Sequence, residues 1–437
     1  MISIPSVYNM MSMSAINKTI SMSTINKSKI LKVISMSTVN KLTLRPASSC
    51  KVTHKISSNS TKTHVVFAKI HKAASSTVHN ILTRFGLRYN LFVMTRMHNM
   101  HISQDSDWIY HRDLVPIPFG AKYDILCCHL VFNKSKIAPY FPKDTSFLGI
   151  VRQPFQRFLS AFVYYTYVYP KPKMTSIVEA NPDDPVSAFL EDPSKWVNQS
   201  APQKVPIDNR MSVDFGFPLH DFENAKKDVN KINSFLHYIN STFDLIMIME
   251  RFDESLVLAR RLFHWTMKDI LYMNVNSFKV EDALNASAID ADSWIHRRNY
   301  SARVTRKFRD WEAIDVALYD FFLQEFTRRL AEQPPDFAEE VETFKAIKNL
   351  VTSYCSSVNE NTTLSCTEIP ATAHNEAIVL TRRDCELMQM EEMYLTHTAR
   401  NMTIFGRLNM TDAEYDLLIQ RGIDKDGRIR KYNKTFW

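Results

Sequence analysis

The feature that most constrains the fold is an alternation of short apolar runs and helical patterns between residues 64 and 330. Helical apolar spacing covers Ser75–Phe85, the segment after Pro154, and Glu254–Phe263. Strands that alternate with helices pair in parallel, and helices cover both faces of their sheet. We therefore expect an α/β fold with a P-loop-like parallel sheet flanked by helices. Its buried strands are expected at four β-branched or aromatic runs: His64–Ile70, Tyr123–Cys128, Phe147–Val151 and Phe243–Met249.

Amino-acid composition and helix-ending prolines divide the chain into three expected parts. Residues 1–60 contain no acid, are rich in Ser, Thr, Asn, Lys and Met, and repeat loosely, which indicates a disordered leader or stalk. An organelle transit peptide shares part of this composition, and no run reaches the roughly 18 apolar residues of a membrane span. Residues 61–335 form the expected main domain, and residues 336–437 a mostly helical, Cys-containing extension.

Three local patterns complete the expected architecture. Gly86 is expected to stop the first helix, and Ser301–Arg329 to form one unbroken helix that ends before Pro334-Pro335. Residues 165–225 are predicted to form an irregular surface excursion, where a substrate is commonly recognised. The prediction rests on the prolines at Pro170, Pro172, Pro182, Pro185, Pro193 and Pro202.

The charge balance favours an anionic ligand. A net charge of +8 and a pI near 9.0 fit a nucleotide, an anionic glycan or a membrane surface, and charge alone does not distinguish these.

Sequons and cysteines indicate the secretory pathway. Cys355, Cys366 and Cys385 lie close together, and a Cys355–Cys366 disulfide would stabilise the extension in an oxidising lumen, with free thiols as the alternative. The sequence contains no CxxC spacing of the kind that would suggest a metal site. Twelve asparagines head Asn-x-Ser/Thr sequons: Asn17, Asn26, Asn59, Asn133, Asn198, Asn240, Asn285, Asn299, Asn361, Asn401, Asn409 and Asn433.

The turn after the first expected strand, His71-Lys-Ala-Ala-Ser-Ser-Thr77, has the character of an anion site. Such a turn aims backbone N–H groups and a helix N-terminus at one point, and Lys72 adds a full charge. It contains no glycine and is not the GxxxxGK[ST] loop, which weakens a kinase or NTPase interpretation. A capped helix with an incidental lysine is the structural alternative.

A second segment, Gly149–Ser160, follows a later strand. Arg152 comes at the carboxyl end of that strand, the edge where open α/β sheets bind ligands, and its guanidinium can grip a phosphate. Ser160, in the following helix, can add a hydroxyl. The alternative for Arg152 is an ordinary surface ion pair.

These segments resemble motifs of Golgi sulfotransferases, and most closely those of the galactose-3-O-sulfotransferase family. KIHKAASST is similar to that family's KTHKTASST, and IVRQPFQRFLSAF to its LRDPxxxFxSxF motif. FDLIMIMERFDESLVL followed by DILY, and the pattern Trp311…Asp315…Tyr319…Phe322, match two further family segments. The four segments occur in family order over about residues 64–330, and the resemblance implies a fold of the sulfotransferase type.

The resemblance implies roles for individual residues. The cofactor would be 3′-phosphoadenosine 5′-phosphosulfate (PAPS), with no metal. Arg152 and Ser160 would hold its 3′-phosphate. His129, in a segment similar to the family's NHMRF, is the first choice for general base, and His71 the second; a hydrogen-bonded structural histidine is the alternative. Gln153 replaces the family's Asp, and Ala73 its Thr. The 5′-phosphosulfate would contact the turn: Lys72, Ala73, Ala74, Ser75, Ser76 and Thr77.

The expected activity is sulfuryl transfer to a sugar hydroxyl. Family likeness implies the 3-hydroxyl of galactose on a glycolipid or glycoprotein, and a Golgi membrane location with a lumenal catalytic domain, although no anchor is visible in the sequence. We expect no nucleic-acid partner. Two alternatives remain: a sulfotransferase for another glycan such as a glycosaminoglycan, and a catalytically silent glycan-binding relative.

Overall fold

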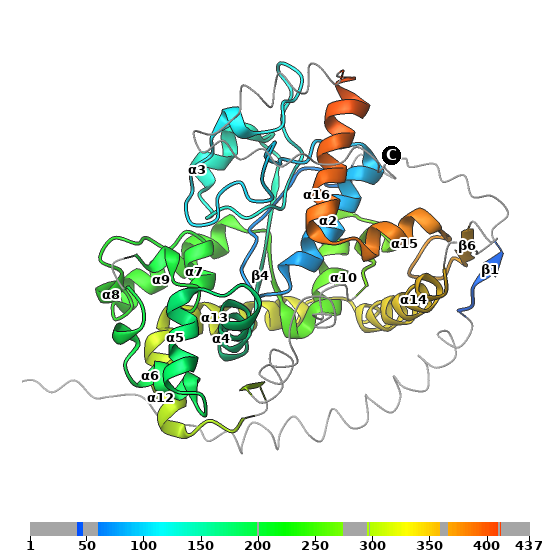
Figure 1. Cartoon of the computed structure of the whole chain (residues 1–437). Coiled ribbons are helices and arrows are strands. Elements are labelled where there is room, and N and C mark those ends of the chain that lie inside the picture. Colours follow the sequence, from blue (N-terminus) through cyan, green and yellow to red (C-terminus); the bar gives the residue numbers. More distant parts are fainter. Residues whose placement is uncertain are drawn as a thin grey trace, which may run out of the picture.

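Four parallel strands form the central sheet of the computed structural model (Figure 1). The strand order is β3-β2-β4-β5, and β2 pairs in parallel with both β3 and β4. The prediction of an α/β fold with a helix-flanked parallel sheet is therefore confirmed. The strands are β2 (Val65–Phe67), β3 (Ile125–Leu126), β4 (Ser146–Val151) and β5 (Leu245–Ile248). The structure describes residues 42–46, 60–198, 201–273, 295–296, 298–358, 366–409 and 411.

The strand residues are apolar because the sheet lies inside the main core. Every residue of these four strands is buried. Helices α2 (Ser75–Tyr89) and α10 (Phe252–Phe263) contribute apolar faces to the same core. The other short helices of the central part are α3 (Lys134–Ile137), α7 (Arg210–Asp214), α8 (Phe222–Ala225) and α9 (Val229–Thr242).

Gly86 does not end the first helix, contrary to the prediction. Helix α2 continues to Tyr89, and Asn90 ends it in the left-handed conformation with its N–H bonded to the Gly86 carbonyl. A Cβ on Gly86 would lie 2.6 Å from a methyl of Val93. The glycine therefore permits close packing of the helix against the next segment, and it is not a stop signal.

The segment predicted to be an irregular surface excursion is largely helical and partly buried. Helices α5 (Pro172–Ala180) and α6 (Pro185–Glu191) each begin at a proline, a residue suited to the first helical turn. They pack with α4 (Pro154–Val163) and α12 (Ala302–Trp311) around a second hydrophobic cluster. Pro172 and Pro185 thus mark helix starts and not loop positions. This explains why the prediction of an irregular segment was wrong.

The expected unbroken helix over Ser301–Arg329 is two helices. The first is α12, and the second is α13 (Ala313–Ala331), with a break at Glu312. The Glu312 carboxylate is fully buried and pairs with the equally buried Arg157 at 2.9 Å. The buried ion pair and the new helix start at Ala313 explain the break, which apolar periodicity does not reveal.

The C-terminal part is mostly helical, as expected, and joins the main core. Its helices are α14 (Phe337–Ser357), α15 (Arg382–Gln389) and α16 (Glu392–Asn401), and residues of all three belong to the large core cluster. A small antiparallel sheet joins β1 (Arg45–Pro46) to β6 (Cys366–Ile369) and β7 (Ile378–Thr381). The division of the chain at residues 60 and 335 stays a prediction.

The disulfide prediction was wrong in its pairing. Cys355 bonds to Cys385, with 5.2 Å between their Cα atoms, and Cys366 is disulfide-bonded elsewhere. Nearness in sequence misled because Cys355, near the end of α14, packs against α15 and not against β6.

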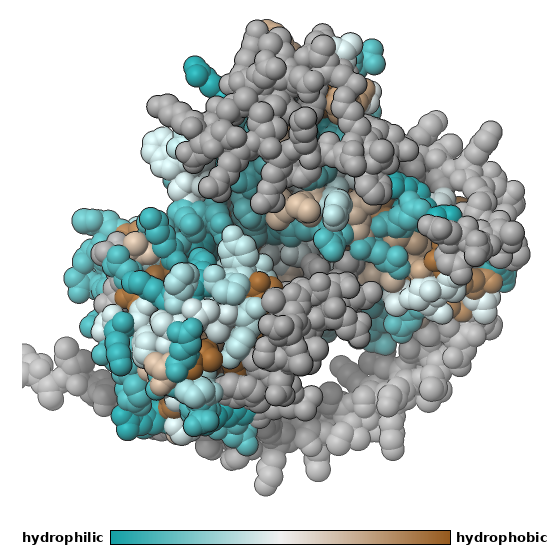
Figure 2. Space-filling model, in the orientation of Figure 1, coloured by the Kyte–Doolittle hydropathy of each residue, from teal (hydrophilic) through white to brown (hydrophobic). Residues whose placement is uncertain are grey.

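The outer surface is largely hydrophilic where Figure 2 shows α5, α6 and α12, with hydrophobic residues in small separate patches. Across the described ranges, no helix combines the length and apolar character that a membrane crossing requires.

Candidate active site

Three predicted site residues come from the carboxyl edge of neighbouring strands. His71 follows β2, His129 follows β3 and Arg152 follows β4 directly. Since these strands are adjacent and parallel, their carboxyl ends meet at one edge of the sheet, where open α/β folds bind ligands.

The turn between β2 and α2 is tightly folded. Lys72 and Ala74 have positive φ angles of 63° and 58°, which non-glycine residues adopt rarely and at a cost of about 1–3 kcal/mol. The Ser75 hydroxyl donates to the Ile70 carbonyl at 2.6 Å and closes the turn from within. The Ser75 hydroxyl is therefore engaged within the turn itself. The turn leads directly into the N-terminus of a 15-residue helix, and a helix N-terminus is a favourable place for an anion.

Arg152 lies against this turn. Its Nη1 donates to the Lys72 carbonyl at 3.0 Å, which joins the two sequence motifs in space. The Lys72 ammonium sits 3.9 Å from the centre of the Tyr164 ring, at the end of α4. Ser160, on α4 and partly exposed, is one turn before Tyr164. The structure thus brings together the residues predicted for the two phosphate groups of the cofactor.

A histidine cluster lies beside the turn. The rings of His71 and His129 stack with their centres 4.0 Å apart, and His101 meets His129 edge-on at 5.0 Å. Nδ1 of His129 and Nδ1 of His101 are buried and have no hydrogen-bond partner among the described residues. His101 was missed in the sequence because nothing in its irregular segment connects it to a strand end.

Burial and neighbouring charges keep the cluster neutral. Burial, followed by the nearby His71 and Lys69, holds the pKa of His129 well below 6.5. Burial lowers the pKa of His101 to about 4. Burial and the Arg210 guanidinium lower the pKa of His71 in the same way. A neutral imidazole can accept a proton, so this cluster has the protonation state that a general base needs.

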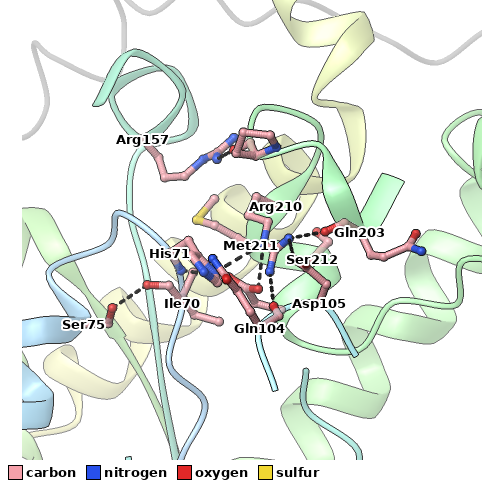
Figure 3. Close-up of polar contacts among 12 residues, drawn as sticks. Ile70, His71, Ser75, Gln104, Asp105, Arg157, Gln203, Arg210, Met211 and Ser212 are labelled. Atoms are coloured by element: carbon pink, nitrogen blue, oxygen red, sulfur yellow. Dashed lines mark hydrogen bonds and ion pairs between the residues drawn. The ribbon is translucent and has the colours of Figure 1, made fainter. Parts of the chain in front are cut away.

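Asp214 and Arg210, both on α7, fix the orientation of His71. One carboxylate oxygen of Asp214 accepts from the His71 backbone N–H and lies 2.8 Å from its ring Nδ1. Arg210 donates to the other oxygen at 2.9 Å. It also donates to the Gln104 carbonyl at 2.7 Å, as Figure 3 shows. The sequence does not indicate either residue, because α7 lies within residues 165–225, where the prolines predict an irregular excursion.

Lys69 and Glu392 were also missed. Lys69 stands two residues before His71, inside the KIHKAASST motif, and a lysine in an otherwise apolar strand run is the signal that could have found it. Its buried ammonium pairs with Glu392 at the start of α16. Among the residues that the structure describes, no group of three or more His, Cys, Asp or Glu side chains is arranged to hold a metal ion.

Comparisons with known proteins agree with this geometry. The family model for galactose-3-O-sulfotransferase matches residues 5–371. The chain belongs to the galactose-3-O-sulfotransferase family. Galactose-3-O-sulfotransferase 3 from Bos taurus is 31% identical over 271 residues, which are 61% of this chain and 57% of that protein. Galactose-3-O-sulfotransferase 2 from Mus musculus is 29% identical over 67% of this chain and 70% of its own length. Galactosylceramide sulfotransferase from Mus musculus is 29% identical, over 61% and 57% respectively.

The site of this family member fits a doubly anionic sulfate donor. Membership in a sulfotransferase family implies PAPS as that donor. The helix N-terminus, Lys72 and Arg152 form one cationic edge next to neutral histidines, and the buried Lys69 beside them is paired with Glu392. This cationic edge suits an anionic ligand.

Proposed function

We propose that this protein transfers a sulfuryl group from PAPS to the 3-hydroxyl of a galactose on a glycolipid or glycoprotein. The observation that carries the proposal is the contact between Arg152 and Lys72, which unites the two donor motifs at 3.0 Å beside a neutral histidine cluster. A phosphate loop alone would fit many nucleotides, whereas a second cationic side chain beside the loop is what a nucleotide with an additional 3′-phosphate requires.

Each donor group has proposed partners. Lys72, Ser76, Thr77 and the backbone N–H groups of the turn at Ala73, Ala74 and Ser75 bind the 5′-phosphosulfate. Arg152 and Ser160 bind the 3′-phosphate. The donor supplies an activated sulfuryl group on a phosphate leaving group. Lys72 stabilises the negative charge that develops on the bridging oxygen, as cationic side chains do in phosphoryl transfer.

His129 is the proposed proton acceptor. The residue is half-buried, and burial with the neighbouring charges keeps its pKa well below the usual range, so the imidazole is neutral. His71 stacks on it and is held by Asp214 at 2.8 Å, which makes His71 the second candidate. The acceptor hydroxyl loses its proton to this pair while its oxygen attacks sulfur.

The acceptor is inferred from the relatives. Their names refer to galactose and to galactosylceramide, which favours a β-galactoside of a glycolipid or glycoprotein. Another glycan acceptor, such as a glycosaminoglycan, is the second candidate. A catalytically silent glycan-binding role is the third.

A Golgi lumenal location is part of the proposal. The Cys355–Cys385 disulfide is the kind of bond that persists in an oxidising compartment. Among the sequons in the described residues, Asn299 is exposed and open to glycosylation, whereas the Asn133 side chain caps α3 and donates to Asp107 at 2.7 Å. Six other sequons, at Asn17, Asn26, Asn59, Asn285, Asn361 and Asn433, lie outside the described residues.

The enzyme assignment is tested with the full chain, ³⁵S-labelled PAPS and a panel of β-galactosides. We expect transfer to at least one galactoside. Lys72→Ala and Arg152→Ala should each weaken binding of 3′-phosphoadenosine 5′-phosphate (PAP) by about 10- to 100-fold, measured calorimetrically, because each removes a charge-assisted contact. The exposed Lys143→Ala serves as control and should bind normally.

The outcomes separate the alternatives. Absence of both transfer and PAP binding would refute the proposal. PAP binding without transfer to any glycan would support the silent relative. Transfer to a glycosaminoglycan but to no galactoside would correct the acceptor.

A further inference from the structure

A buried lysine precedes the phosphosulfate turn. Lys69 lies between the end of β2 and His71, and its side chain has no exposed surface. A buried ammonium without a counter-ion costs several kcal/mol, so a lysine in such a place requires an anion beside it. Here the anion is the carboxylate of Glu392.

Glu392 reaches the turn from the first residue of α16. One of its oxygens pairs with the Lys69 ammonium, and the other accepts from the Ser76 hydroxyl at 2.8 Å. Burial raises the pKa of Glu392, but the Lys69 ammonium and the neighbouring histidines together outweigh burial and hold the pKa well below its usual value. The carboxylate is therefore a charged, two-oxygen group bound at the N-terminus of α2.

The carboxylate engages groups that an anionic donor also needs. A serine hydroxyl carries one hydrogen, and that of Ser76 points to Glu392. Ser76 cannot give the same hydrogen to a sulfuryl or phosphate oxygen at the same time. Lys69 is likewise neutralised while Glu392 is in place.

Helix α16 stays attached without this contact. Thr396 bonds to His79 of α2 at 3.2 Å, and the Asn80 amide donates to the Leu387 carbonyl of α15 at 3.0 Å. Figure 1 shows α15 and α16 beside α2. These contacts do not involve the Glu392 carboxylate, so the attachment of α15 and α16 to α2 does not depend on it alone.

We propose that Lys69 and Ser76 form an oxyanion subsite of the donor site, and that the Glu392 carboxylate fills this subsite when no donor is bound. Donor binding then displaces the carboxylate, which acts as an intramolecular competitor. Lys69 is thereby a third donor-binding cation besides Lys72 and Arg152. The inference rests on the proposed function. Glu392 lies beyond residues 5–371 that match the family model, so family membership does not assign it.

The test measures PAP binding to the full chain by calorimetry. Glu392→Gln keeps the shape but removes the competing charge, so we expect PAP to bind about tenfold more tightly. Glu391→Gln is the matched control, since Glu391 is the preceding residue, is exposed, and should leave affinity unchanged. Circular dichroism checks that each variant is folded.

A double variant examines Lys69 without leaving a buried charge unpaired. Lys69→Met combined with Glu392→Gln removes both members of the ion pair, and should bind PAP at least tenfold more weakly than Glu392→Gln alone. Equal affinity of these two would show that Lys69 is not a donor ligand.

The failures are distinguishable. If the wild-type chain binds no PAP, the proposed function fails. If the wild-type chain binds PAP and Glu392→Gln binds it equally or more weakly, the donor site stands and the competitor role of Glu392 is overturned.

Discussion

At the scale of single residues, the site combines side chains that the sequence could identify with others that it could not. Lys72, Arg152 and His129 follow strands, and a strand end is recognisable from an apolar run. Asp214 orients His71 from a segment 143 residues away, and Glu392 contacts Ser76 across 316 residues. Such pairs depend on how helices pack, which local periodicity does not determine.

The environment of His129 leads to a prediction about pH. Its pKa in the folded protein lies well below 6.5, so the imidazole stays neutral until the pH falls below the usual histidine range. Protonation then removes the base, and activity falls as the pH decreases. We expect kcat/KM to keep its plateau through pH 6.5 and to lose it only at lower pH.

The pH profile is compared with variants. His129→Ala should lower kcat by about 100-fold or more while PAP affinity changes little, in line with the usual contribution of a general base. If His71→Ala lowers kcat more than His129→Ala does, His71 is the general base. His220→Ala, at an exposed histidine, should behave as wild type. An acid limb centred at or above pH 6.5 contradicts the assigned environment.

At the scale of elements, α7 and α13 cap each other, and this contact holds the histidine site in place. The buried Asp315 carboxylate, near the start of α13, accepts from the backbone N–H groups of Met211 and Ser212 at 3.0 and 2.7 Å. In return the Asn209 side chain accepts from the N–H groups of Ile314 and Asp315 at 2.8 and 3.0 Å. Each helix start thus satisfies the unpaired donors of the other.

The sequence could predict the four strands and the helical character of Ser301–Arg329, but neither α7 nor this exchange. Apolar spacing continues across Glu312, so the pattern suggested one helix where there are two. The break depends on Arg157 and Asn209, whose side chains come from other parts of the chain.

We expect Asp315→Ala to destabilise the fold by about 3 kcal/mol, because two backbone donors and the Ser212 hydroxyl lose their buried acceptor. Asp315→Asn keeps an acceptor oxygen and should cost less, about 1–2 kcal/mol. Urea denaturation measures both. Asp320→Ala, at an exposed position of the same helix, should stay within about 0.5 kcal/mol of wild type. Equal costs for Asp315→Ala and Asp320→Ala would show that the cross-capping contributes nothing.

At the scale of the whole molecule, the C-terminal part belongs to the same structure as the sheet. Helices α15 and α16 pack on α2, and α14 packs on α10. The sequence indicated a helical, cysteine-containing region, but a helical pattern does not tell which surface it covers. Only the folded chain places Glu392 beside Ser76 at the start of α2 and pairs Cys355 with Cys385.

The Cys355–Cys385 disulfide should stabilise this arrangement by closing a loop between α14 and α15. The two residues are 30 positions apart, and closing a loop of that length in the unfolded chain corresponds to about 3–4 kcal/mol. Cys355→Ala combined with Cys385→Ala should therefore lower the free energy of unfolding by that amount in oxidising buffer. Because Cys366 is disulfide-bonded in wild type and variant alike, adding reductant during urea denaturation should destabilise wild type more than the variant. Equal sensitivity of wild type and variant to reductant would mean that this disulfide does not contribute to stability, and that packing alone holds α15 and α16 against α2.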